Sequence, residues 1–296
     1  MFKKLFGSKG EKPLSKADYS FGLRESLIIK QQLDKKEYGQ VEELLSKLDS
    51  DNLSHVVDHL SLNTKESELI KWYDSKNQSD AASLVLGVFY AHKGWWCRGH
   101  GVASEVTEEG ALGFLDYESK AEGILTKISG NKLYVAEAHC RLIRVYMSLG
   151  DREQMLQSFN KCVSLDPLKV WAYVHKLEAI EPKWGGSKEE VSELLNQLPD
   201  SKLISDIVNM KLLGDSFTWE EWLADDENIN VVEEAKSRIR SIDRELTSSP
   251  HQSILRFMVY GYIVNLSQNT GDKDLLNKYA GKMENHYTLY PFGMTK

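Results

Sequence analysis

Residues 136–167 contain two helical patterns separated by a sharp break at Gly150-Asp151. The apolar or small positions recur at the spacing of one helix face: Ala138, Leu142, Ile143, Tyr146, Leu149, Met155, Phe159 and Cys162. Asp166-Pro167 closes the unit. A single hairpin of this size cannot bury its own apolar stripe and has to stack on neighbours. The segment therefore predicts stacked helical hairpins, which form a curved surface rather than a catalytic pocket.

Two more hairpins are predicted near the ends of the chain. Residues 21–48 show helical spacing on either side of a polar turn, and residues 254–283 do so around Gly271-Asp272, the same turn chemistry as Gly150-Asp151. The helix over residues 81–96 is the most apolar and is expected to lie at the centre. A further helix is predicted over residues 112–128.

No β-type alternation of useful length interrupts these patterns, so the fold is predicted to be all-α, a solenoid of antiparallel helical hairpins. A flexible basic tail is expected over residues 1–16. One helical-repeat domain is expected over residues 17–296, with its best repeat unit at 136–169.

The net charge of −7 disfavours nucleic acid as the main partner, because phosphate binding needs a positive field. An acidic surface would suit a basic protein or peptide partner, although a charge of this size is also ordinary for solubility. No segment approaches the roughly 18 uncharged apolar residues of a membrane span, and the start of the chain lacks the apolar core of a signal peptide. Stable membrane insertion is therefore not expected.

Three cysteines, Cys97, Cys140 and Cys162, show no C-x-x-C spacing, which indicates neither a disulfide framework nor a zinc site. The expected location is the reducing cytoplasm. The eight histidines show no metal-ligand spacing either. No metal or other cofactor is expected, and no catalytic residue can be named, because no orienting group or oxyanion-binding element accompanies Cys97.

The unit at 136–167 resembles the tetratricopeptide-repeat superfamily. Two strings sharpen the resemblance: residues 95–101, Trp-Trp-Cys-Arg-Gly-His-Gly, and residues 181–187, Glu-Pro-Lys-Trp-Gly-Gly-Ser. With a repeat between them, they are similar to an uncharacterised bacterial family of tetratricopeptide-like proteins, in which a Trp-x-x-Arg-Gly element precedes the repeat and a Pro-x-Trp-Gly-Gly-Ser element follows it. The resemblance implies a helical-repeat fold and carries no activity.

The loop over Trp184, Gly185, Gly186 and Ser187 is the most site-like segment. Its glycines permit positive φ and close approach of a ligand or of another backbone, and the following helix start offers free N–H groups. The alternative is purely structural: Pro182 ends one helix, the glycines turn the chain, and Ser187 caps the next helix.

Arg98 follows an apolar helix and is predicted either to pair with Asp116 or Glu118 or to bind an acidic terminus of a partner. Trp95, Trp96 and Trp171 line a groove in one interpretation and fill the core in the other. Trp and Arg are the residue types enriched at binding hot spots.

These observations favour a non-catalytic protein–protein interaction module of a bacterial cytoplasm. Its sharper form is an immunity or adaptor protein that binds and neutralises, or positions, a partner protein. The partner-binding residues would be Trp95, Trp96, Arg98, Trp171, Trp184, Gly185 and Gly186. The alternative is a small-ligand-binding or enzymatic protein that uses the Trp184–Ser187 loop and Arg98.

Overall fold

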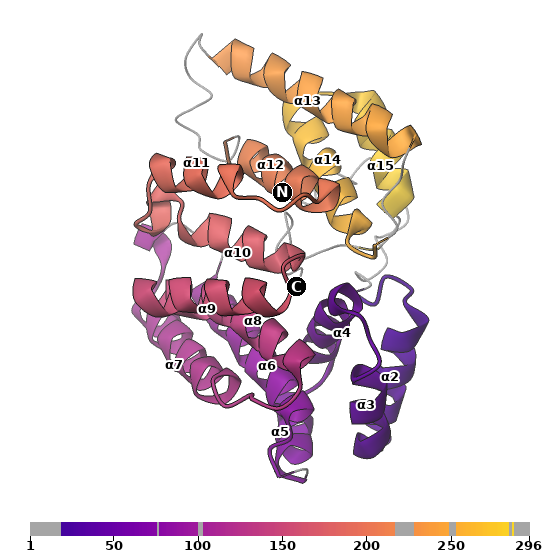
Figure 1. The fold of residues 1–296 in the computed structure, drawn as a ribbon, viewed down its shortest axis with the longest axis vertical. Coiled ribbons are helices and arrows are strands. Elements are labelled where there is room, and N and C mark those ends of the chain that lie inside the picture. The colour runs from indigo at the N-terminus through magenta and orange to yellow at the C-terminus, as the bar shows by residue number, and fades with distance from the viewer. Residues whose placement is uncertain are drawn as a thin grey trace. The chain divides into compact units, whose positions relative to one another are not determined.

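The computed structural model describes residues 19–75, 77–99, 103–216, 228–248, 253–283 and 286 (Figure 1). Within these ranges every regular element is a helix and no strand occurs, which confirms the all-α class. The chain divides into two compact units, one of residues 23–211 and one that combines the described parts of 1–22 and 212–296. The predicted tail over residues 1–16 lies outside the described residues.

The first unit contains these helices: α2 (Arg24–Asp34), α3 (Tyr38–Leu45), α4 (Ser50–Asn63), α5 (Glu66–Ser75), α6 (Asp80–Arg98), η1 (Ala103–Glu105), α7 (Glu108–Leu125), α8 (Lys132–Leu149), α9 (Arg152–Leu165), α10 (Val170–Ala179), η2 (Pro182–Trp184) and α11 (Lys188–Asn196). The division between the units falls within α12 (Lys202–Ser216). The second unit contains α13 (Asn228–Ser248), α14 (Arg256–Thr270) and α15 (Lys273–Met283). None of the described helices combines the length and the apolar character that crossing a lipid bilayer requires.

The hairpin predicted at 136–167 is formed by α8 and α9, which pack against each other (Figure 1). Gly150 ends α8 in the left-handed conformation with φ of 75°, which glycine adopts without steric cost. Asp151 then caps α9, because its Oδ1 accepts a hydrogen bond from the Gln154 backbone N–H at 3.0 Å. The break predicted at Gly150-Asp151 is therefore confirmed.

Helix α6 contains the predicted 81–96 segment and packs against α4, α5, α7 and α8. Its residues 81–88 are all buried, which confirms that its first half lies in the core. Its partner α7 crosses very closely, since a Cβ added at Gly94 would lie 3.0 Å from Glu118 Oε1. Small residues at this crossing let the two helix backbones approach.

The second unit repeats the glycine–aspartate turn between α14 and α15. Gly271 has φ of 74°, and Asp272 Oδ1 accepts from the Leu275 backbone N–H at 3.2 Å. Phe21 packs on Phe257 of α14, with ring centroids 5.1 Å apart. The residues just before α2 therefore belong to the core of the C-terminal helices.

Candidate functional site

Three residues from the two sequence strings meet at the end of α6 and at η2. The Trp95 and Trp184 rings pack edge to face with centroids 5.7 Å apart. The Arg98 guanidinium lies 5.7 Å from the Trp95 ring centroid and 5.8 Å from that of Trp184. A cation at this range is attracted to the negative face of an indole. A fourth member, Arg144 of α8, lies 4.2 Å from the Trp95 centroid. We call Trp95, Arg98, Arg144 and Trp184 the Trp–Arg cluster.

The loop after η2 positions Trp184. Gly185 has φ of 85°, a conformation that favours glycine. A Cβ added at Gly186 would lie 1.9 Å from the Ile180 carbonyl oxygen, so the backbone itself occupies the space that a side chain would need. Ser187 Oγ accepts from the Glu190 backbone N–H at 3.2 Å and caps α11. Turn geometry, backbone packing and capping account for this loop, and no observation favours a small ligand there.

A buried carboxyl group lies behind the cluster. Glu118 of α7 is fully buried, and neither of its oxygens has a hydrogen-bond partner. Burial raises its pKa well above the usual value, against the opposing charge of Arg144. Arg144 forms an ion pair with Glu178, Nε to Oε2 at 3.3 Å. The arginine whose charge acts on Glu118 is therefore Arg144 of α8, and the pair considered between Arg98 and Glu118 is not formed. Asp116, the other acid considered for Arg98, pairs with Lys120 at 2.7 Å.

The two other predicted tryptophans lie elsewhere. Trp96 is 52% exposed on the last turn of α6, with Lys93 Nζ 5.9 Å from its ring centroid. Trp171 is buried in α10, and its ring lies 5.5 Å from that of His175. The structure thus brings Trp95, Arg98 and Trp184 together, leaves Trp96 open to solvent and places Trp171 in the core.

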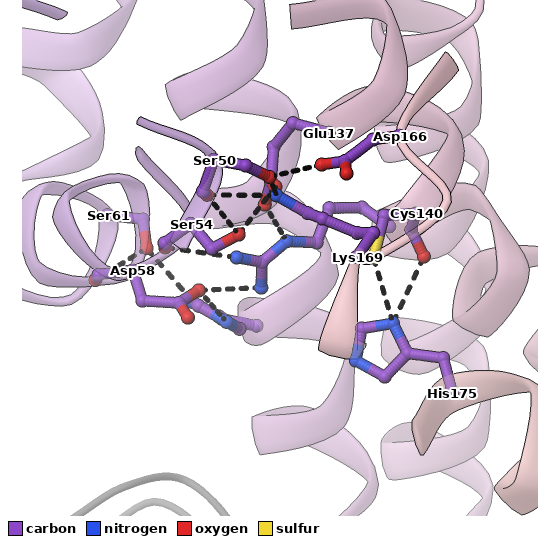
Figure 2. A network of polar contacts seen from close by, with 11 residues as sticks. Ser50, Ser54, Asp58, Ser61, Glu137, Cys140, Asp166, Lys169 and His175 are labelled. Atoms are coloured by element: carbon purple, nitrogen blue, oxygen red, sulfur yellow. Dashed lines mark hydrogen bonds and ion pairs between the residues drawn. The ribbon is translucent and has the colours of Figure 1, made fainter. Parts of the chain in front are cut away.

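A buried ion network, absent from the sequence-based predictions, joins α4 to α8 and to the start of α10 (Figure 2). Glu137 Oε1 pairs with Arg141 Nε at 2.7 Å, and Glu137 Oε2 pairs with Lys169 Nζ at 2.5 Å. Arg141 Nη1 then reaches Asp58 Oδ1 at 2.7 Å. Ser54 Oγ donates to Glu137 Oε2 at 2.6 Å. We call these five residues the buried ion network.

Hydroxyl and imidazole groups extend the network at both ends. Ser50 Oγ accepts from Lys169 Nζ at 2.8 Å and donates to Asp166 Oδ2 at 2.5 Å. At the other end His92 Nε2 lies 3.3 Å from Asp58 Oδ1, and its Nδ1 lies 3.0 Å from Ser61 Oγ. The contacts run between segments that are far apart in sequence, so they fix how α4 sits against α8.

The positive charges of the network keep its two carboxylates ionised. Burial alone would raise the pKa of Glu137, but the charges of Lys169 and Arg141 outweigh it and hold the pKa at about 2. The pKa of Asp58 is likewise lowered, because Arg141 and His92 outweigh the effect of burial. Both carboxylates are thus ionised at neutral pH and paired inside the protein. Such an arrangement orders helices and offers no free acid or base.

A Cys–His contact lies beside the network and is equally enclosed. Cys140 Sγ is 3.8 Å from His175 Nδ1, and that nitrogen is 3.0 Å from the Cys140 carbonyl oxygen (Figure 2). Burial raises the pKa of the Cys140 thiol, so it stays protonated and is not a nucleophile. Cys97, the cysteine weighed at the sequence level, packs against Gly110 and Gly113 of α7. In the described part of the chain no group of three His, Cys, Asp or Glu side chains is placed to hold a metal ion.

The sequence does contain a signal for the network: polar residues recur at the spacing of a helix face that is normally apolar and buried. Ser54, Asp58 and Ser61 repeat at i, i+4 and i+7 along α4, where an apolar stripe is the usual pattern. Glu137 and Arg141 are four apart within the apolar stripe of α8. Charges inside such a stripe indicate partners on another helix, because a buried charge is costly unless it is paired.

Comparison of this chain with protein-family models, curated proteins and solved structures finds no match.

Proposed function

We propose that this chain is a non-catalytic interaction protein, a solenoid of tetratricopeptide-like hairpins that binds a protein or peptide around the last turn of α6 and the η2 loop. One observation carries the proposal: Trp96 exposes 52% of its surface on that turn. A tryptophan normally buries most of its apolar area, so an open indole is an anchor that a partner can cover.

The neighbouring Trp–Arg cluster also favours partner binding at this surface. Arg98 and Trp184 are half-buried, and both are held in place by contacts with Trp95. Side chains that are ordered before binding lose little conformational entropy on association. An Arg held between two indoles is therefore a pre-organised contact.

The chemistry of the interior supports the non-catalytic part of the proposal. The charges of the buried ion network are paired, and the Cys140 thiol beside it is kept protonated. Catalytic groups instead need a poised protonation state and access to a substrate.

The resemblance to the bacterial helical-repeat family extends the proposal to a cytoplasmic adaptor or immunity protein. The net charge of −7 would steer a basic partner towards it. In this form the chain neutralises or positions another protein by occupying its surface.

A pull-down from a native-like bacterial lysate with the full chain tests the proposal, followed by a binding titration with the purified partner. We expect to recover a stoichiometric partner. Trp96→Ala is expected to weaken its binding free energy by about 2 kcal/mol, as is typical of an aromatic hot spot. Trp184→Ala is expected to weaken binding less, because its ring also packs on Trp95.

Leu168→Ala is the matched control, since Leu168 is an apolar side chain that is 56% exposed in the turn before α10. It is expected to bind as the wild type does. The proposal fails if no stoichiometric partner is recovered under several conditions. It also fails if Trp96→Ala and Leu168→Ala retain the partner equally.

A further inference from the structure

A hollow of about 440 Å³ lies in the second unit, between α13 and the turn that joins α14 to α15. Its lining includes Glu233, Lys236, Ser237, Arg240, Arg244 and Asp272. Three of these side chains are cationic and two are anionic, so the lining has an excess of one positive charge. This part of the chain lies outside every segment that the proposed function uses.

Two of the three cations are already compensated. Lys236 Nζ pairs with Glu233 Oε1 at 2.7 Å, one turn apart on α13. Arg240 Nε pairs with Asp272 Oδ2 at 2.9 Å. Asp272 is itself held, because its other oxygen caps α15 through the Leu275 backbone N–H. The cap therefore fixes the carboxylate, and the carboxylate fixes the Arg240 guanidinium at the rim of the hollow.

The hollow also presents hydrogen-bond donors that have no acceptor. Arg244 makes no hydrogen bond or ion pair with any described residue, and the Arg240 pair uses only Nε, which leaves its two terminal nitrogens unbonded. The Ser237 hydroxyl adds a further unused donor. Arg240 and Arg244 are four residues apart on α13, where like charges repel each other. An anion between them would satisfy the donors and relieve this repulsion.

We propose that this hollow binds the phosphate group of a phosphorylated small molecule. The paired N–H donors of a guanidinium group match the oxygens of a phosphate. Arg240, Arg244 and the Ser237 hydroxyl together supply more donors than a carboxylate ligand could accept, which favours phosphate over carboxylate. The hollow is much larger than a phosphate ion and falls within the size range of small-molecule sites. The phosphate lies against Arg240 and Arg244, and the organic part occupies the remaining space.

Isothermal titration of the full chain with inorganic phosphate and with glycerol 3-phosphate, at constant ionic strength, tests the proposal. We expect saturable binding of one molecule per chain, with the ester binding at least as tightly as the free ion. Arg244→Gln is expected to weaken binding about tenfold, the usual loss for a charged hydrogen-bond donor. Because Arg244 has no partner in the described structure, the circular dichroism spectrum and melting temperature of this variant should match those of the wild type.

Arg238→Gln is the matched control, since Arg238 is exposed on the same helix and does not line the hollow. It removes the same charge and is expected to leave the affinity within a factor of two. Equal weakening by both variants would overturn the proposal in favour of a diffuse positive field. Absence of saturable binding at millimolar phosphate would also overturn it, as would an ester that binds more weakly than inorganic phosphate.

Discussion

Arg141 Nη1 lies 2.7 Å from Asp58 Oδ1, and this contact joins α8 to α4 across 83 residues of sequence. Both side chains are less than a tenth exposed, so each has exchanged its hydration for the charge of the other. A buried ion pair of this kind contributes little net stability relative to well-packed apolar residues at the same positions. Loss of one partner, however, leaves a buried charge uncompensated and costs stability. The contribution of Arg141 is therefore best seen by removing it.

Arg141→Met is expected to destabilise the first unit by about 3–5 kcal/mol, because Asp58 and Glu137 both lose a guanidinium contact inside the protein. Urea unfolding followed by circular dichroism measures the change. Arg152→Met is the control, since Arg152 forms its ion pair with Glu190 at the surface and should cost less than about 1 kcal/mol. Similar losses in the two variants would show that the network adds nothing beyond an exposed pair.

Acid is expected to unfold the first unit through the same network. The pKa of Glu137 falls from 4.5 to about 2 on folding, because the charges of Lys169 and Arg141 outweigh burial. A lowered folded-state pKa contributes stability that is present above the unfolded value and is lost as the pH falls through the folded one. The urea midpoint of the wild type should therefore drop steeply between about pH 5 and pH 2.

Glu137→Gln tests this assignment. The variant is less stable at pH 7, because Lys169 and Arg141 lose a carboxylate, but its urea midpoint should change less with acid than that of the wild type. Glu109→Gln, at an exposed position on α7, should retain the wild-type slope. A Glu137→Gln profile parallel to the wild type would remove Glu137 as a source of the acid sensitivity.

The secondary structure follows from the sequence where local chemistry decides it. The breaks predicted at Gly150-Asp151 and Gly271-Asp272 are confirmed, and in each the glycine is left-handed and the aspartate caps the next helix. The Ser187 cap of α11 is also confirmed. These features depend on neighbours within a few residues, which a sequence pattern contains.

Helix α7 begins at Glu108, four residues before the predicted start at residue 112. The cause is local, since Thr107 Oγ1 caps the helix by accepting from the Gly110 backbone N–H, and the predicted start overlooks this cap. Other features depend on tertiary packing. Gly110 lies in the first turn of α7, where a larger residue would not fit because a Cβ there would meet the Cys97 carbonyl oxygen at 2.9 Å. The meeting of Arg98 with Trp184 likewise depends on contacts across 86 residues, which no local pattern encodes.

Glu118→Gln is expected to stabilise the protein at alkaline pH. Burial raises the pKa of Glu118 above its unfolded value of 4.5, so its contribution to stability is complete below that value and is lost as the pH rises through the raised pKa. Glutamine has nearly the same shape and no charge, so it avoids this loss. The variant should exceed the wild type by about 1 kcal/mol or more at pH 8 and match it near pH 4. Glu122→Gln, at a half-buried position on the same helix, should show no such pH-dependent gain, and a gain equal to that of Glu118→Gln would contradict the assignment.

Gly186→Ala and Gly123→Ala are expected to change stability in opposite directions. A Cβ at Gly186 would lie 1.9 Å from the Ile180 carbonyl oxygen, and backbone cannot move aside as a flexible side chain can, so the loss should be about 1–3 kcal/mol or more. A Cβ at Gly123 meets nothing within 4 Å in α7, and alanine there should add about 0.5–1 kcal/mol through helix propensity. Thermal unfolding compares the two variants with the wild type. If Gly186→Ala were as stable as the wild type, backbone packing would not explain this glycine, and the loop after η2 would again be a candidate for a small ligand.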